Sequence, residues 1–286
     1  MKDINILPLS EEWIPPHLLC RVNELETLKT SIDSPLPNHW WIDGKNGTGK
    51  TVTIRGHLVP FLRLKGHMVF YHNMERGGCE NNIKKWTQGF MRKTNDMDNV
   101  ITKIHELSHD KQKIIFIFDD LQHLINMKRD FSPRLLKIFN QVGQYAQGEG
   151  YLHPFQVILV SQIPWKDRMK YLKVDVLDRY QFETLKFGRY DRHEMMGILA
   201  QRIKYIYGDN KKKDVCSYLA SIVENKMESN LRTAIKILKK IVLEKGDYTR
   251  ENVDSMIEEL EEKAWRDTLL KDFTPHRALD IYLIAR

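Results

Sequence analysis

Residues 43–53 read DGKNGTGKTVT. The stretch has the spacing of a phosphate-binding P-loop, in which Gly44 and four further residues precede Gly49-Lys50-Thr51. Glycines let the backbone turn tightly, so that successive N–H groups point towards a phosphate, and the helix that follows adds its positive dipole end. Lys50 is expected to reach the β- and γ-phosphates, and Thr51 to offer its hydroxyl to Mg²⁺. The residues predicted to bind a nucleotide here are Gly44, Asn46, Gly47, Thr48, Gly49, Lys50, Thr51 and Val52.

The flanking sequence supports this interpretation, because a P-loop connects a strand to a helix. Residues 39–42 (HWWI) form a short apolar run, and residues 51–63 place apolar side chains on one helical face. Neighbouring side chains on a strand face opposite ways, so at most one of Trp40 and Trp41 could stack on a ligand. We therefore expect both tryptophans to belong to the core.

Short apolar runs alternate with amphipathic stretches as far as residue 185. Continuous apolar runs bounded by polar residues are typical of buried parallel strands. The alternation predicts an α/β fold, with a parallel sheet that is covered by helices on both faces. The predicted strands are 39–42, 67–71, 113–118, 155–160 and 180–185, and helices are predicted near 78–93, 97–108 and 132–147.

From about Tyr190 onward only helical periodicity is present. The predicted helices are 190–207, 212–226, 230–245, 250–267 and 275–285. Thr249 is expected to cap the N-terminus of the fourth. The chain is thus predicted to have an α/β nucleotide-binding domain at 1–187 and a helical lid at 188–286. A short linker between them would let the nucleotide state set the angle of the lid.

The second half of a nucleotide site is predicted at residues 114–120, IIFIFDD, an apolar strand that ends in two acids. Asp119 is expected to hold Mg²⁺ through its water shell, because a hard cation prefers oxygen ligands. Asp120 is expected to orient and deprotonate the attacking water. The strand at 155–160 is followed by Ser161 and Gln162, either of which could hydrogen-bond the γ-phosphate or that water.

Composition narrows the possible classes of protein. The chain has 286 residues, of which 42% are hydrophobic, so a packed core is expected. No apolar run approaches the roughly 18–20 residues that span a bilayer, and the start has no signal-peptide pattern. We expect an intracellular protein with no membrane partner. The three cysteines are too far apart for a disulfide framework or a metal site. His105–His109 matches HExxH, but no third ligand is marked out, so we expect no zinc.

The net charge of +7 favours anionic partners such as nucleic acid. Basic residues gather at 202–213 (RIKYIYGDNKKK) and at Lys236, Lys239 and Lys240. Either cluster could contact phosphates, or could be a solvated helix face. Phosphate contacts carry little sequence information, so any binding of double-stranded DNA through them is expected to be non-specific.

Several segments, taken in order along the chain, resemble those of AAA+ ATPases of the initiator clade. Among these, the chain resembles the archaeal and eukaryotic origin-recognition and helicase-loading (cell-division-control type) replication initiators. Besides the P-loop, the segments are WIPPHLLCRVNELETLKTSI at 13–32, VFYHN at 69–73, VLDRYQFETLKFGRY at 176–190 and ESNLRTAIKIL at 228–238. They resemble, respectively, the family's N-terminal segment, its second strand ending in Tyr-x-Asn, its arginine-finger segment and its sensor-2 lid motif.

The resemblance implies an ATPase that binds ATP or ADP with Mg²⁺ and assembles with copies of itself or related AAA+ subunits. It implies DNA, and a replicative helicase, as further partners. Arg232 would reach the γ-phosphate from the lid, and Arg179 would enter a neighbouring subunit's site as an arginine finger. Tyr190 and the region of Arg21 would line the adenine pocket. From the residues alone, Arg179 could equally pair with a nearby aspartate, and Arg232 could be an ordinary surface arginine.

The chain also departs from the family's pattern. Asp120 stands where the family usually has glutamate, one methylene longer, and Ser161 or Gln162 stands where it usually has asparagine. We therefore expect slow hydrolysis, with ATP acting mainly as a switch. Residues 273–286 resemble the helix that begins the family's winged-helix domain, and the chain then stops, so the domain is either absent or removed. Two other hypotheses stay open: a transposition-type AAA+ regulator that forms ATP-dependent filaments on DNA, and a non-catalytic nucleotide-binding adaptor.

Overall fold

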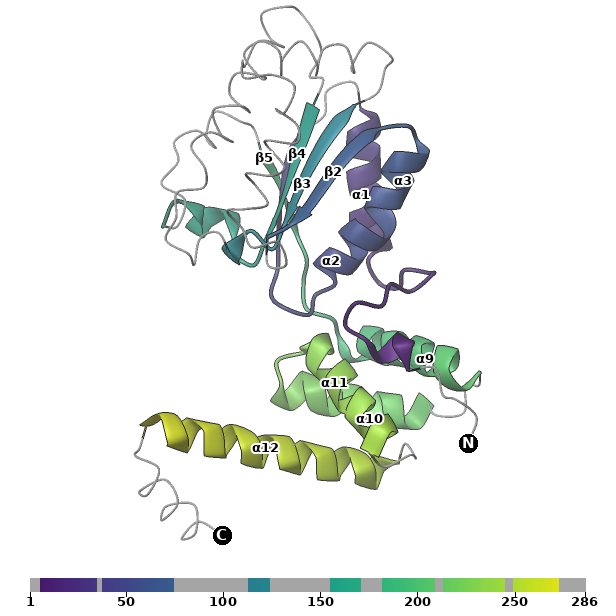
Figure 1. The fold of residues 1–286 in the computed structure, drawn as a ribbon, viewed down its shortest axis with the longest axis vertical. Helices are drawn as coiled ribbons and strands as arrows, with labels where there is room; N and C mark the ends of the chain where they lie inside the picture. The colour runs from purple at the N-terminus through teal and green to yellow at the C-terminus, as the bar shows by residue number, and fades with distance from the viewer. Residues whose placement is uncertain are drawn as a thin grey trace, which may run out of the picture. The chain divides into compact units, whose positions relative to one another are not determined.

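The structure is a computed structural model that describes most of the chain in several stretches. The described residues are 6–34, 38–74, 113–123, 155–170, 182–208, 213–244 and 249–272. The chain divides into two compact units, which we name the sheet unit (Pro16–Arg189) and the helical unit (Met1–Pro15 with Tyr190–Arg286). Both are drawn in Figure 1. The domain limits expected from the sequence, 1–187 and 188–286, stay a prediction.

The sheet unit contains a five-stranded parallel sheet among its described residues (Figure 1). Its strands are β1 (His39–Asp43), β2 (Met68–Asn73), β3 (Ile114–Asp119), β4 (Phe155–Ser161) and β5 (Phe182–Lys186), in the order β2-β3-β4-β1-β5. All neighbouring strands pair in parallel. This arrangement confirms the predicted α/β fold class, and every predicted strand overlaps an observed one. The apolar runs were informative because a parallel sheet buries both faces.

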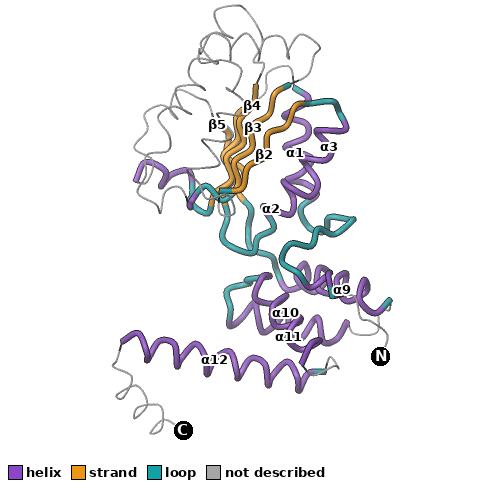
Figure 2. Tube along the Cα trace, viewed as in Figure 1, coloured by secondary structure: helices purple, strands orange, loops and turns teal. Residues whose placement is uncertain are grey.

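One face of the sheet is covered by helices that come before and after the P-loop, as Figure 2 shows. They are α1 (Val22–Asp33), α2 (Lys50–Thr53), the π-helical η2 (Ile54–Leu58) and α3 (Val59–Leu64). Their apolar side chains form a buried cluster with Trp40 and Ile42 of β1 and with alternate residues of β3 and β4. Trp41 is also fully buried, so both tryptophans belong to the core as predicted. The helices predicted near 78–93, 97–108 and 132–147 lie outside the described residues.

The strand register brings polar residues to the carboxyl edge of the sheet. Asn73 of β2 is paired with Asp119 of β3, and Asp43 of β1 with Ser161 of β4. The P-loop starts directly after Asp43, so it lies at this same edge. In open parallel sheets the carboxyl ends of the strands are where ligands bind.

The helical unit has four long helices among its described residues. They are α9 (Arg192–Tyr207), α10 (Lys213–Lys226), α11 (Leu231–Glu244) and α12 (Arg250–Asp272). Thr249 accepts a hydrogen bond of 3.3 Å from the backbone N–H of Asn252, which confirms the predicted N-cap. The helix predicted at 275–285 lies outside the described residues. No described helix is long and apolar enough to cross a bilayer.

Within the helical unit, the N-terminal segment packs around Arg202 of α9. A short 3-10 helix, η1 (Leu7–Leu9), precedes Ser10, and the Arg202 guanidinium donates to the carbonyls of Pro8 and Ser10. Arg202 is 4% exposed and its guanidinium lies 5.0 Å from the centre of the Trp13 ring. Two interpretations were open for residues 202–213, a phosphate-contacting surface and a solvated helix face, and neither applies to Arg202. Its charge is buried, and a buried charge is retained only where acceptors compensate for lost water.

Candidate functional site

The P-loop joins β1 to α2, which is the strand–loop–helix context that the sequence predicted. Gly47 and Gly49 have φ angles of 78° and 88°, a left-handed conformation that glycine adopts without strain. Successive residues that alternate in this way turn their N–H groups to one side and form a concave anion site. Thr48 is buried, and its hydroxyl donates to the carbonyl of Lys45 at 2.9 Å, which holds the loop closed from within.

Lys50 is the first residue of α2 and is 7% exposed. Its ammonium group donates to two carbonyls of its own loop, that of Gly44 at 2.5 Å and that of Lys45 at 3.0 Å. A phosphate bound in the loop would compete with these carbonyls for Lys50. An anionic acceptor makes the stronger, charge-assisted bond, so the competition favours the phosphate.

Asp119 lies at the end of β3 and is fully buried. One of its oxygens, Oδ2, accepts a hydrogen bond of 2.7 Å from the Tyr71 hydroxyl, and the carboxylate is also hydrogen-bonded by Thr51. Burial, and then the charge of Asp120, raise the pKa of Asp119 to about 6, while the bonds from Tyr71 and Thr51 oppose the shift. Burial and the nearby Asp119 raise the pKa of Tyr71, so its hydroxyl stays a donor.

The pair Thr51 and Asp119 is suited to a hard divalent cation. A hydroxyl and a carboxylate are oxygen ligands of the kind that Mg²⁺ prefers, and the cation would compensate for the buried carboxylate charge. No group of three or more His, Cys, Asp or Glu side chains is arranged for a metal within the described residues. Mg²⁺ at this place would therefore also depend on the nucleotide phosphates. The HExxH sequence at 105–109 lies outside the described residues.

Asp120 follows β3 in a left-handed conformation, with φ of 58°. Both of its carboxylate oxygens accept hydrogen bonds from amide side chains, from Asn73 at 2.8 Å and from Gln122 at 3.1 Å. Gln122 in turn accepts from the backbone N–H of Gln162 at 3.2 Å. A water that Asp120 is to deprotonate must therefore compete with amide donors that already occupy both oxygens.

The sequence did not assign roles to Tyr71, Asn73 and Gln122 beside the two acids. The register explains their position, since β2 and β3 are paired so that Asn73 is opposite Asp119. The sequence signal that could have identified them is the polar residue at the end of the strand next to β3. Tyr71 and Asn73 were named only as part of the VFYHN segment that resembles the family's second strand. Gln122 lies two residues after Asp120, beyond the strand, and carries no such signal.

The remaining predicted site residues are placed as follows. Arg21 is buried beside the P-loop, where its Nε donates to the carbonyl of Thr48 at 3.1 Å. Tyr190 is buried, and belongs to the helical unit. Arg232 lies on α11, about half exposed, with its Nε 3.2 Å from a carboxylate oxygen of Glu11. Arg179 lies outside the described residues. The functional roles assigned to all four stay predictions.

The second basic cluster of the sequence is partly offset by carboxylates. Lys236 lies 3.2 Å from Glu11, and Lys240 lies 2.8 Å from Glu259 of α12. Both lysines keep a substantial exposed fraction, so either could still approach a phosphate. Such exposed ion pairs are weak and exchange readily with other ions. The choice between a DNA-contacting surface and a solvated helix face thus stays open.

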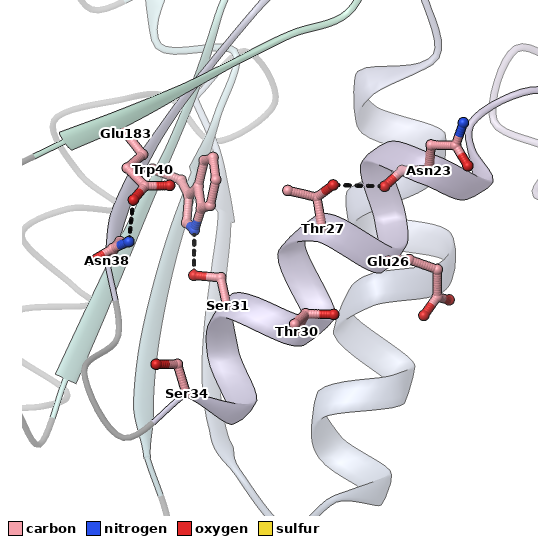
Figure 3. A pocket seen from close by; sticks show the side chains of 9 residues that line it. All are labelled: Asn23, Glu26, Thr27, Thr30, Ser31, Ser34, Asn38, Trp40 and Glu183. Carbon is pink, nitrogen blue, oxygen red and sulfur yellow. Dashed lines mark hydrogen bonds between the residues drawn. The ribbon is translucent and has the colours of Figure 1, made fainter.

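A polar groove of about 650 Å³ lies along α1, and Figure 3 shows the side chains that line it. It is bounded by hydroxyl side chains of α1, among them Thr27, and by Trp40 and Glu183 near the starts of β1 and β5. The parallel strands begin on this side and end beside the P-loop. The groove is therefore at the opposite edge of the sheet and is not part of the candidate nucleotide site.

Comparison with known proteins finds no matching family model and no significantly matching curated protein. Solved structures are similar in fold. The ORC1 protein of Aeropyrum pernix in complex with DNA has a TM-score of 0.67 at 18% identity, over 95% of this chain and 73% of that one. The ORC2 protein of the same organism, in an ADP form, has a TM-score of 0.65 at 16% identity, over 97% and 82%.

A bacterial initiator is similar as well. Domain III of the replication initiation protein DnaA of Thermotoga maritima has a TM-score of 0.57 at 18% identity, over 90% of this chain and 98% of that one. Identities this low establish the fold alone. The chain therefore shares the fold of these initiator structures, which is the fold class that its motifs predicted.

Proposed function

We propose that the chain is a nucleotide switch of the AAA+ initiator type. It binds ATP or ADP with Mg²⁺, hydrolyses ATP slowly, and uses the bound nucleotide to control DNA binding and assembly. The observation that carries the proposal is the meeting of the P-loop with a buried acid, because Thr51 hydrogen-bonds Asp119 and Lys50 begins the same helix. These are the groups that phosphate and Mg²⁺ need in one place.

Each of these residues has a distinct task in the proposal. The loop N–H groups and Lys50 bind the β- and γ-phosphates, and Thr51 and Asp119 hold the Mg²⁺ that neutralises phosphate charge. Arg232 reaches the γ-phosphate from the lid, and Arg179 acts in a neighbouring AAA+ subunit, so that assembly responds to ATP. Adenine as the base, DNA as a partner and a replicative helicase as a further one follow from the resemblance. Similar structures with DNA and with ADP support the first two.

Gel mobility of labelled duplex DNA of random sequence tests the switch. The chain is titrated with ATP, ADP or no nucleotide across a series of salt concentrations. We expect retardation that needs ATP and weakens steeply with salt, because phosphate contacts release counterions. Absence of retardation in every state would contradict DNA control by this chain and assign DNA contact to a partner. Retardation that grows with DNA length into filaments would favour the transposition-type hypothesis.

Slow hydrolysis is tested by lengthening the side chain of the proposed base, Asp120. Asp120→Glu is expected to raise ATP turnover about tenfold, since a general base contributes roughly 10²–10⁴-fold when well placed and Asp120 is one methylene short. The amide groups of Asn73 and Gln122 hold the carboxylate of the shorter Asp120. The matched control is Asp120→Asn, which keeps the length, removes the basic group and is expected to lower turnover.

Steady-state ATPase rates at saturating ATP and Mg²⁺ give the comparison. Nucleotide affinity is measured alongside, and is expected to be about the same in all three proteins, because the Asp120 carboxylate is hydrogen-bonded to Asn73 and Gln122, which lie outside the P-loop. Equal turnover in the wild type and Asp120→Glu would show that the length of this side chain does not limit hydrolysis. Turnover that is undetectable in all three would favour the non-catalytic adaptor.

A further inference from the structure

Arg21 is a buried cation that the proposed phosphate chemistry does not use. It immediately precedes α1 and is 5% exposed. Burying a charge is costly unless it is paired and hydrogen-bonded, so a guanidinium in this position indicates a specific set of acceptors. Those acceptors come from three parts of the sheet unit that are far apart in the sequence.

The guanidinium joins the P-loop to the chain after β5. Its Nε donates to the carbonyl of Thr48 at 3.1 Å, and its Nη2 donates to the carbonyl of Gly188 at 2.6 Å. Its Nη1 donates to Glu24 at 2.9 Å, which compensates for the charge. Arginine alone presents donors in several fixed directions of one plane, whereas lysine has a single ammonium on a flexible stem. The two carbonyls are therefore held at a fixed separation by one rigid group.

The start of the P-loop, at Asp43 and Gly44, also contacts the chain that follows β5. The backbone N–H of Phe187 donates to the carbonyl of Asp43 at 2.7 Å, directly before the loop. A Cβ atom on Gly44 would lie 2.6 Å from the Phe187 carbonyl oxygen, so the two backbones are in close contact. The Arg21 guanidinium lies 5.6 Å from the centre of the Phe187 ring. Both ends of the P-loop are thus coupled to residues 187–188.

We propose that Arg21 is a positioning residue that couples the P-loop to the connector, by which we mean residues 187–189. The connector is the last part of the sheet unit before the chain enters the helical unit at Tyr190. The inference rests on the proposed binding of nucleotide at the P-loop. It adds that a bound nucleotide restrains the connector, and that this restraint passes through the Arg21 guanidinium.

The coupling follows from the hydrogen bonds of the loop. A bound phosphate replaces the carbonyls of Gly44 and Lys45 as the acceptor of the Lys50 ammonium. The N–H groups of the loop then close around the anion. Once the loop is fixed, the Thr48 carbonyl is fixed with it, and Arg21 transfers the restraint to Gly188. A segment held at more points opens less often, and its amide hydrogens exchange more slowly.

Hydrogen exchange of the full chain measures the coupling directly. Exchange is followed in peptides that cover residues 43–53 and 186–190, with and without saturating ADP and Mg²⁺. In the wild type we expect ADP to slow exchange in both peptides, by about fivefold or more in the connector. In Arg21→Lys we expect ADP to slow exchange in the P-loop peptide alone, because an ammonium on a flexible stem does not hold the two carbonyls at the fixed separation that the planar guanidinium sets.

Glu24→Gln is the matched control, since it removes the charge that pairs with Arg21 and leaves both carbonyl bonds in place. We expect it to behave as the wild type. If the role of Arg21 were purely structural, Arg21→Lys would speed exchange in both peptides, with and without ADP. The P-loop peptide and the connector peptide would then respond alike. Thermal unfolding confirms that each variant is folded before exchange is measured.

The outcomes separate this inference from the proposed function. If the wild type binds no ADP, and neither peptide is protected, the proposed nucleotide site is wrong. If the wild type binds ADP but only the P-loop peptide is protected, the coupling is overturned while the nucleotide site stands. Protection of both peptides in Arg21→Lys, as in the wild type, overturns the role of Arg21 in the same way.

Discussion

Lys50→Ala is expected to reduce the affinity for ADP and ATP by roughly 10²–10⁴-fold, since two hydrogen bonds between charged groups are together worth about 3–6 kcal/mol. Lys50 is buried at the start of α2, and its ammonium already lies against the loop carbonyls, so no large rearrangement is needed for it to meet a phosphate. Fluorescent-nucleotide titration, with and without Mg²⁺, measures the loss. The loss is expected in both conditions, because the lysine acts on the phosphates and not through the metal.

The control for Lys50→Ala is Arg63→Ala, in the last turn of α3, which removes one positive charge from an exposed position on the same run of helices. We expect its nucleotide affinity to stay within about threefold of the wild type, because exposed charges are screened by salt. A thermal-shift measurement gives an independent reading, since a ligand that binds only the folded state raises its unfolding temperature. If Lys50→Ala bound nucleotide as well as Arg63→Ala, the nucleotide would have to bind elsewhere on the chain.

The strands and the P-loop could be predicted from the sequence because both depend on local patterns. Apolar runs such as IIFIF at 114–118 identify strands buried on both faces, and the spacing of Gly44, Gly49 and Lys50 is fixed by a single turn of backbone. The proximity of Thr51 to Asp119 also followed, since the carboxyl ends of parallel strands meet at one edge of the sheet. These inferences require the order of elements along the chain and little knowledge of side-chain packing.

The contacts of the arginines could not be predicted in this way. The acceptors of Arg202 are backbone carbonyls of Pro8 and Ser10, and those of Arg21 include carbonyls of Thr48 and Gly188. Every residue has a backbone carbonyl, so such partners leave no mark in the sequence. A buried arginine therefore cannot be distinguished from an exposed one in the sequence alone. For this reason Arg202 was wrongly grouped with the basic residues that follow it.

The amide groups around Asp120 illustrate a different limit. The sequence identified Asp120 from its position after an apolar strand, and its short side chain led to the expectation of slow hydrolysis. It could not show that Asn73 and Gln122 occupy both carboxylate oxygens, because that depends on the register of β2 and β3 and on the left-handed turn at Asp120. These contacts favour the same outcome for an additional reason, since a base that already accepts two hydrogen bonds is less available to water.

Gly44→Ala is expected to lower both stability and nucleotide affinity, although it adds only one methyl group. The new Cβ would lie 2.6 Å from the Phe187 carbonyl oxygen and 3.0 Å from the Phe187 Cβ. Neither atom can move easily, because Phe187 follows β5, which is paired with β1 as far as Asp43 and Lys186. Overpacking of this kind typically costs about 1–3 kcal/mol. For a unit of this size the unfolding temperature should then fall by roughly 3–10 °C.

Gly188→Ala is the matched control for Gly44→Ala, because a Cβ at Gly188 meets no atom within 4 Å. We expect its free energy of unfolding to stay within about 0.5 kcal/mol of the wild type. Affinity separates the two variants further. Movement of Gly44 displaces the P-loop N–H groups that face a phosphate, so ADP should bind about tenfold or more weakly to Gly44→Ala, whereas Gly188→Ala keeps the carbonyl that Arg21 contacts. Equal stability and affinity in the two variants would mean that the P-loop can move away from β5 at no cost, and the connector could then not be restrained by the loop.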